Sequence, residues 1–126
     1  MKLRFVVLAL LMFVSLVGVG LLAPGTARAQ TSDDCVHAPT ISSLRICVQH
    51  AADQGFIDNQ GVTNSLLAKL DAAQAAQDRG QTEVTINQLD AFIHEVQAQA
   101  GKHIDPMHAQ HLVMHAQMVI HALQHG

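Results

Sequence analysis

The sequence contains no tryptophan and no tyrosine, and aromatic residues make up only 3% of its 126 residues. Charged residues are also scarce, at 13%. A chain of this length is too short for two ordinary domains or for a large enzyme fold such as the TIM barrel. With so few aromatic side chains it has no platform on which nucleic-acid bases could stack.

The N-terminal segment has the pattern of a secretory signal peptide. Lys2 and Arg4 supply a basic start, residues 5–22 are almost wholly apolar, and a Pro-Gly pair precedes an Ala-Arg-Ala site that ends at Ala29. We therefore predict a signal peptide over residues 1–29 and secretion into the extracellular or periplasmic space. The alternative is a retained transmembrane anchor, because the apolar run is about long enough to span a bilayer.

Beyond residue 29 the chain is acidic. It keeps 4 basic and 10 acidic residues, which gives a net charge of −6 when histidine is neutral. Such a chain repels nucleic-acid phosphates, so we expect no nucleic acid among its partners. After cleavage of the signal we also expect no stable membrane anchor. The expected partner is an unknown exported protein or a second copy of the chain.

The chain has 2 cysteines, Cys35 and Cys47. Cysteines of exported proteins usually pair, so we predict a disulfide between them. It would tie a flexible N-terminal lead, residues 30–41, to the first helix and contribute about 3 kcal/mol in the chain-entropy model. A redox or metal-binding pair is the alternative, which the absence of a C-x-x-C motif disfavours.

Apolar residues at helical spacing predict an all-α fold over residues 42–126, a compact bundle of about four antiparallel helices. No strand pattern is present. Capping residues and glycines set the expected limits of the helices: Ser42, Asp58, Thr82 and Asp105 at the starts, and Gly55, Gly80 and Gly101 at three of the ends. The predicted core positions are Leu44, Cys47, Val48, Ala51, Val62, Leu66, Leu70, Ala73, Ile86, Leu89, Ile93, Val96, Ala100, Leu112, Ala116, Val119, Ile120 and Leu123.

Two of the predicted loops share a short pattern. Residues 55–58 and residues 101–105 both run from a glycine through an isoleucine to an aspartate. Either two helical hairpins arose by duplication, or the same capping chemistry arose twice.

Histidine is unusually abundant, and most of it lies in the last predicted helix. The chain has 9 histidines, and 6 of them fall in residues 103–126. On a helical wheel the histidines and methionines of this helix lie away from its apolar side, with His108 at the boundary. Histidines three or four residues apart can share a metal ion, and thioethers favour copper(I). The candidate ligands for Cu, Zn or Ni are His108, His111, His115, His121, His125, Met114 and Met118.

Other interpretations of this surface stay open. The histidines can be ordinary solvated residues, or they can bind metal weakly and adventitiously. Exposed Met114 and Met118 can instead form the contact surface for a partner.

Two stretches of the sequence resemble the signatures of the FIMAH domain family. The first is Asn64–Ala73, and the second is Ile86–Gln99 followed by Gly101–Ile104. The similarity extends over about residues 43–124. It implies an α-helical module of exported bacterial and archaeal proteins, commonly attached to larger extracellular enzymes or Ig-like domains, with no known catalytic residues. The cysteine pair and the histidine- and methionine-rich last helix depart from the family pattern.

Within the first stretch, Lys69 lies near the edge of the apolar stripe. Its ammonium group is expected to reach solvent or a carboxylate, with Asp90 as the candidate partner.

Motifs of catalysis are missing from the sequence. It has no glycine-rich phosphate loop and no nucleophile elbow, and no spacing forces two carboxylates together. We therefore predict a non-enzyme without a cofactor, an exported interaction or accessory module of unknown partner. The alternative is an exported metal-binding or metal-buffering protein that uses the last helix.

Overall fold

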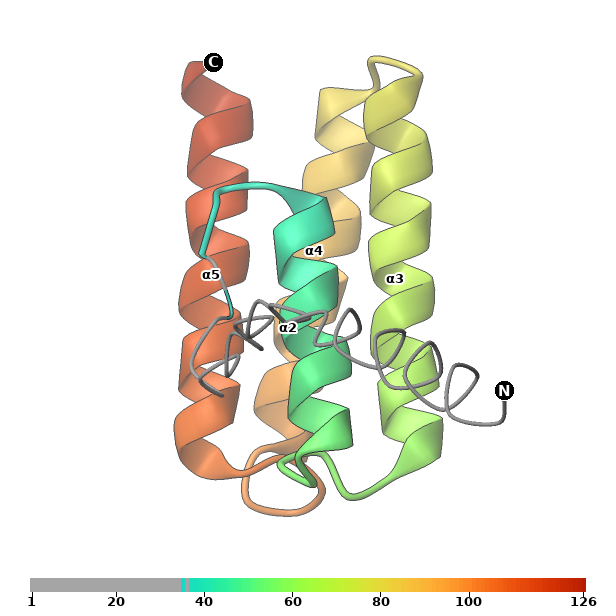
Figure 1. Ribbon diagram of the computed structural model, residues 1–126. Helices are drawn as coiled ribbons and strands as arrows, with labels where there is room; N and C mark the ends of the chain where they lie inside the picture. The colour runs from blue at the N-terminus through green and yellow to red at the C-terminus, as the bar shows by residue number, and fades with distance from the viewer. Residues whose placement is uncertain (1–34, 36) are drawn as a thin grey trace, which may run out of the picture. The chain divides into compact units, whose positions relative to one another are not determined.

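The computed structural model describes Cys35 and residues 37–126. These residues form four helices: α2 (Ile41–Asp53), α3 (Gln60–Asp78), α4 (Thr82–Gln99) and α5 (Pro106–His125). Successive helices run antiparallel, and α2 also contacts α5, so the four close into a ring (Figure 1). The predicted all-α bundle is confirmed, whereas the predicted signal peptide, residues 1–29, lies outside the described residues. In the part of the chain that the structure describes, no helix combines the length and the apolar character needed to cross a membrane.

The first helix begins earlier than predicted. Thr40 caps it, not Ser42, because the Thr40 hydroxyl accepts a hydrogen bond of 3.2 Å from the backbone N–H of Ser43. The earlier start puts Ile41 on the core face, where only 2% of it is exposed. Ile41, which the sequence assigned to the flexible lead, is therefore the first residue of the bundle.

A second predicted cap is also displaced. Asn59 caps α3, and its side-chain oxygen accepts from the backbone N–H of Val62 at 3.1 Å. The expected cap, Asp58, instead bonds through its carboxylate to the ring of His103, at 2.9 Å. Asp105 caps α5 as predicted, accepting from two backbone N–H groups of the first turn.

Every core position predicted in α2 and α3 is buried, and Ile41 of α2, Ala76 of α3 and residues of the other two helices add to the core. In α4 Phe92 is fully buried, although it lies outside the predicted stripe. This helix packs against both α3 and α5, so its buried arc is wider than one stripe. In contrast, four predicted core positions are only partly buried: Ile86 of α4, Ala100 just after it, and Ile120 and Leu123 of α5. Thr85 and Val119, the residues next to Ile86 and Ile120, are buried, so the buried face of each helix is rotated from the predicted stripe.

The two loops with the shared pattern pair with each other. The backbone N–H of Asp58 donates to the carbonyl of His103 at 3.1 Å, and that of Asp105 donates to the carbonyl of Phe56 at 2.9 Å. Ile57 and Ile104 between them are 4% and 2% exposed. Both loops lie at the same end of the bundle (Figure 1). The pairing holds the end of α2 beside the start of α5.

Lys69 pairs with Glu95, not with the predicted Asp90. Its Nζ lies 2.5 Å from the Glu95 carboxylate, and Ser65 bonds to both groups. Successive helical residues are 100° apart, so Asp90 points about 140° away from Glu95 around α4. The ion pair links α3 to α4 and is partly shielded, with side-chain exposures of 29% and 17%.

We expect Glu95→Gln to lower the free energy of unfolding by about 1 kcal/mol, because the ammonium of Lys69 loses its partner in a partly buried position. Asp90→Asn removes a charge of the same sign five residues earlier in α4, at an exposed position, and is the matched control. Urea unfolding of both variants measures the difference. An equal cost in the two variants would contradict the assignment.

Candidate functional site: a histidine-lined pocket beside a disulfide

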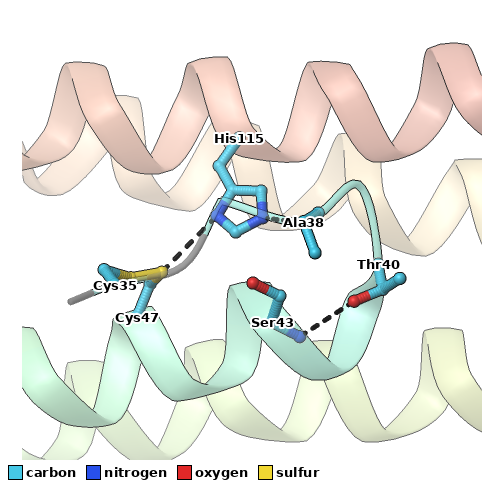
Figure 2. Close-up of a disulfide and its surroundings, with 6 residues drawn as sticks. All are labelled: Cys35, Ala38, Thr40, Ser43, Cys47 and His115. Carbon is cyan, nitrogen blue, oxygen red and sulfur yellow. Dashed lines mark hydrogen bonds between the residues drawn. A yellow bond between two sulfur atoms is a disulfide. The ribbon is translucent and has the colours of Figure 1, made fainter.

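The predicted disulfide is present. Cys35 and Cys47 are bonded, with their Cα atoms 5.3 Å apart, and the described residues include no free cysteine. Cys47 lies on the buried face of α2, while Cys35 belongs to the segment that precedes the helix. The bond therefore holds this segment against the bundle (Figure 2).

His115 of α5 points toward α2 and lies between the disulfide and Ala38 (Figure 2). Its Nε2 is 2.7 Å from the carbonyl oxygen of Ala38, and its Nδ1 is 3.5 Å from Sγ of Cys47. A carbonyl oxygen only accepts hydrogen bonds, so Nε2 carries the hydrogen, and Nδ1 of the neutral ring has a lone pair.

The prediction that His115 faces outward is wrong, because only 1% of this residue is exposed. A helical wheel places residues relative to the apolar stripe of one helix. It cannot show that the segment at Ala38, 77 residues earlier in the chain, covers the adjoining side of α5.

Burial lowers the pKa of His115, since removal from water disfavours the charged ring. The nearby ring of His37, with its centroid 5.2 Å away, lowers the pKa further, while the hydrogen bond to Ala38 opposes these effects. The His115 ring is therefore neutral at pH 7.

A pocket of about 520 Å³ opens beside this histidine, between α2 and α5. Histidines from both ends of the described chain converge on it: His37, His50, His108, His111 and His115. Both disulfide cysteines also line it, together with Phe56 and Met107. His37 and His50 were absent from the predicted ligands. The sequence did offer a signal for His50, because it lies about one helical turn after Cys47 and therefore on the same side of α2 as the disulfide.

The predicted ligands of α5 divide between the pocket and the rest of the helix. His108 and His111 line the pocket with ring centroids 6.1 Å apart. The His121 and His125 rings stack on each other, 4.2 Å apart, and His125 donates through Nδ1 to the carbonyl of its partner at 2.9 Å. The structure thus brings three of the five predicted histidines to one pocket. It does not bring Met114 and Met118 there.

His108 already has two partners. Its ring stacks on Phe56 with centroids 3.5 Å apart, and its Nδ1 lies 3.0 Å from the carboxylate of Asp105. This side-chain hydrogen bond is the main reason that the pKa of Asp105 is lowered, and the backbone N–H of His108 adds to the effect. The Asp105 carboxylate therefore caps α5 and orients one imidazole of the pocket.

Among the described residues, one group of three side chains has ligand atoms close enough to share a metal ion. It consists of Cys35, His37 and Cys47, whose ligand atoms all lie within 4.8 Å of one another. In the disulfide form the two sulfurs are bonded to each other, and thiolates are the ligand form of cysteine.

The FIMAH domain model matches residues 41–121. The chain belongs to the FIMAH domain family. The match begins at the first residue of α2 and ends inside α5, so it includes α2, α3, α4 and most of α5 and leaves Cys35 and His37 outside. Comparisons with curated proteins and with solved structures gave no match.

Burial of a neutral histidine makes stability depend on pH. The unfolded chain takes up a proton at His115 near pH 6.5, whereas the folded chain resists it. The contribution of neutral His115 to the free energy of unfolding is therefore complete above about pH 6.5. It is lost as the pH falls toward the lower pKa of the folded chain. We expect the stability of the wild type to fall more steeply between about pH 7.5 and about pH 5 than that of His115→Gln.

Urea unfolding at several pH values measures this slope. His94→Gln, at an exposed position of α4, is the control and should keep the slope of the wild type. If His115→Gln also keeps that slope, another group carries the pH dependence.

Proposed function

We propose that this chain is a non-catalytic helical module of an exported protein, and that it acts by binding a second protein through one side of α5. Membership of the FIMAH family supports a helical module. The signal-peptide pattern of residues 1–29 supports export. The observation that carries the binding proposal is a stripe of exposed methionines on α5.

Three methionines lie at spacings of seven and four residues, so they fall within about 40° of one another around the helix. They are Met107, Met114 and Met118, with exposures of 64%, 55% and 42%. Packing within the chain does not explain why such large apolar side chains occupy these positions, because they are exposed. Exposed apolar patches of this kind mark contact surfaces, and flexible methionine side chains adapt to a partner.

A hollow of about 420 Å³ adjoins the stripe between α4 and α5. Its lining carries no charged side chain: Gln97, Ala100, Pro106, Ala109, Gln110, Val113 and Met114. This composition fits an apolar segment of a partner. The chain beyond residue 29 carries a net charge of −6, which disfavours a second copy and favours a partner with basic residues around that segment.

Site-specific photo-crosslinking in the producing cells tests the surface. A crosslinker at Met114 should capture an exported protein that a crosslinker at Ala75, an exposed position of α3, does not capture. With the captured protein purified, Met118→Lys should weaken binding by at least about tenfold, because an ammonium would enter an apolar contact. Met118→Leu keeps the apolar surface and is the matched control. Equal capture at Ala75, or equal affinity of the two Met118 variants, would contradict the proposal.

Metal binding by imidazoles is a second candidate function. His50 of α2 and His108 and His111 of α5 line one pocket, which favours it. Their ring nitrogens do not form a group close enough to share an ion in this structure, so binding would require side-chain rotation. Neutral imidazole is a ligand for Zn, Cu and Ni. The role would be buffering of such an ion outside the cell.

Titration of the untagged, disulfide-bonded chain with Cu²⁺, Zn²⁺ and Ni²⁺ tests the second candidate. Replacement of His108 and His111 by alanine should abolish saturable binding. Replacement of His121 and His125, which lie outside the pocket, should leave it unchanged. Absence of binding tighter than micromolar would rule out this function.

A further inference from the structure

One side of the pocket carries four potential metal ligands, which come from the segment before α2, from α2 and from α5. The ligand atoms of Cys35, His37 and Cys47 lie within 4.8 Å of one another, and Nδ1 of His115 lies 3.5 Å from Sγ of Cys47. Around a tetrahedral zinc ion, neighbouring ligand atoms are roughly 3.3–3.8 Å apart, given the usual Zn–S and Zn–N bond lengths. Nδ1 of His115 lies outside the group of three, so the four ligands would reach one ion only after the sulfurs separate and side chains rotate.

The orientation of His115 is that of a metal ligand. Histidine ligands usually donate their second ring N–H to a carbonyl or a carboxylate, which fixes the tautomer and leaves the other nitrogen free to coordinate. His115 donates through Nε2 to the carbonyl of Ala38 at 2.7 Å and directs Nδ1 at the cysteine pair. A disulfide sulfur has no hydrogen to donate. The Nδ1 lone pair, on a residue with 1% exposure, therefore faces a group that cannot satisfy it.

We propose that reduction of the Cys35–Cys47 disulfide creates a binding site for a tetrahedral d¹⁰ ion such as Zn²⁺, held by the two thiolates and the imidazoles of His115 and His37. This site goes beyond the proposed contact surface on α5. It also differs from the imidazole site of the second candidate function, because two of its ligands are sulfurs. It exists only in the reduced chain.

The chemistry balances with a dithiol as the reductant. The dithiol supplies two electrons and two protons, breaks the Cys35–Cys47 bond and becomes a disulfide itself. Zinc binding then displaces the protons of the two thiols, so each ion bound releases two protons at pH values where the thiols are protonated. Two thiolates neutralise the charge of the ion, and the neutral imidazoles add none. Oxidation of the thiolates by a disulfide-class oxidant reverses the sequence and releases the ion.

Metal binding would also preserve the connection between α2 and the segment before it. The disulfide and the metal both join Cys35 to Cys47, and both keep Ala38 near His115. Reduction without metal should lower the melting temperature of the chain, and zinc should restore part of the loss. Zinc should not raise the melting temperature of the oxidised chain through this site.

Cobalt titration of the full chain, reduced with a phosphine under anaerobic conditions, tests the proposal. We expect about one Co²⁺ per chain, with thiolate-to-cobalt charge-transfer absorbance and tetrahedral visible bands that Zn²⁺ abolishes by displacement. His115→Gln and His37→Gln should each weaken Zn²⁺ binding by about tenfold or more, measured against a competing chelator. His94→Gln is the matched control.

Variants of His108 and His111 separate this site from the imidazole site. Replacement of His108 and His111 by alanine should leave the thiolate absorbance intact, and replacement of both cysteines by serine should abolish it. Circular dichroism of each reduced variant verifies that it is folded. If a variant does not fold, the test rests on the cobalt absorbance of the reduced wild type. Absence of thiolate-to-cobalt absorbance in the reduced, folded wild type would overturn the proposal. So would equal zinc affinities of folded His115→Gln and His94→Gln.

Discussion

The pocket depends on the pairing of the two interhelical loops. Two backbone hydrogen bonds, from Asp58 to His103 and from Asp105 to Phe56, join the end of α2 to the start of α5. Burial of Ile57 and Ile104 in the same contact removes apolar surface from water and stabilises the pairing. Helix α2 has only 13 residues, so an anchor at one end determines where its other residues meet α5. Cys47 and His115 face each other as a result.

His115 connects the bundle to the segment before it. Burial of a polar ring is costly unless its nitrogens are bonded, and the carbonyl of Ala38 satisfies one of them. The disulfide holds the Ala38 segment in place, so the covalent bond and the buried histidine support the same contact. The second ring nitrogen is not satisfied by the disulfide. This unsatisfied ring nitrogen distinguishes the site from the rest of the bundle.

Helix α5 serves different purposes on adjoining sides. Its apolar positions complete the core, its pocket-facing histidines meet α2, and its exposed Met114 lines the hollow next to α4. The family match ends inside this helix and begins after Cys35 and His37. The bundle is thus a property of the family. Cys35 and His37, by contrast, lie outside the match.

The sequence by itself determined the class of the fold, the number of helices, most of the core and the disulfide, because helical periodicity, glycine at helix ends and cysteine pairing are local or compositional signals. It missed Phe92, since a single stripe underestimates a helix with two neighbours. It indicated Asp90 and not Glu95 as the partner of Lys69, because spacing along one helix does not determine which of its turns faces Lys69. Only the tertiary structure decided that His115 is buried and that His37 and His50 join it. Those contacts link residues from opposite ends of the described chain, and no periodicity within one helix encodes them.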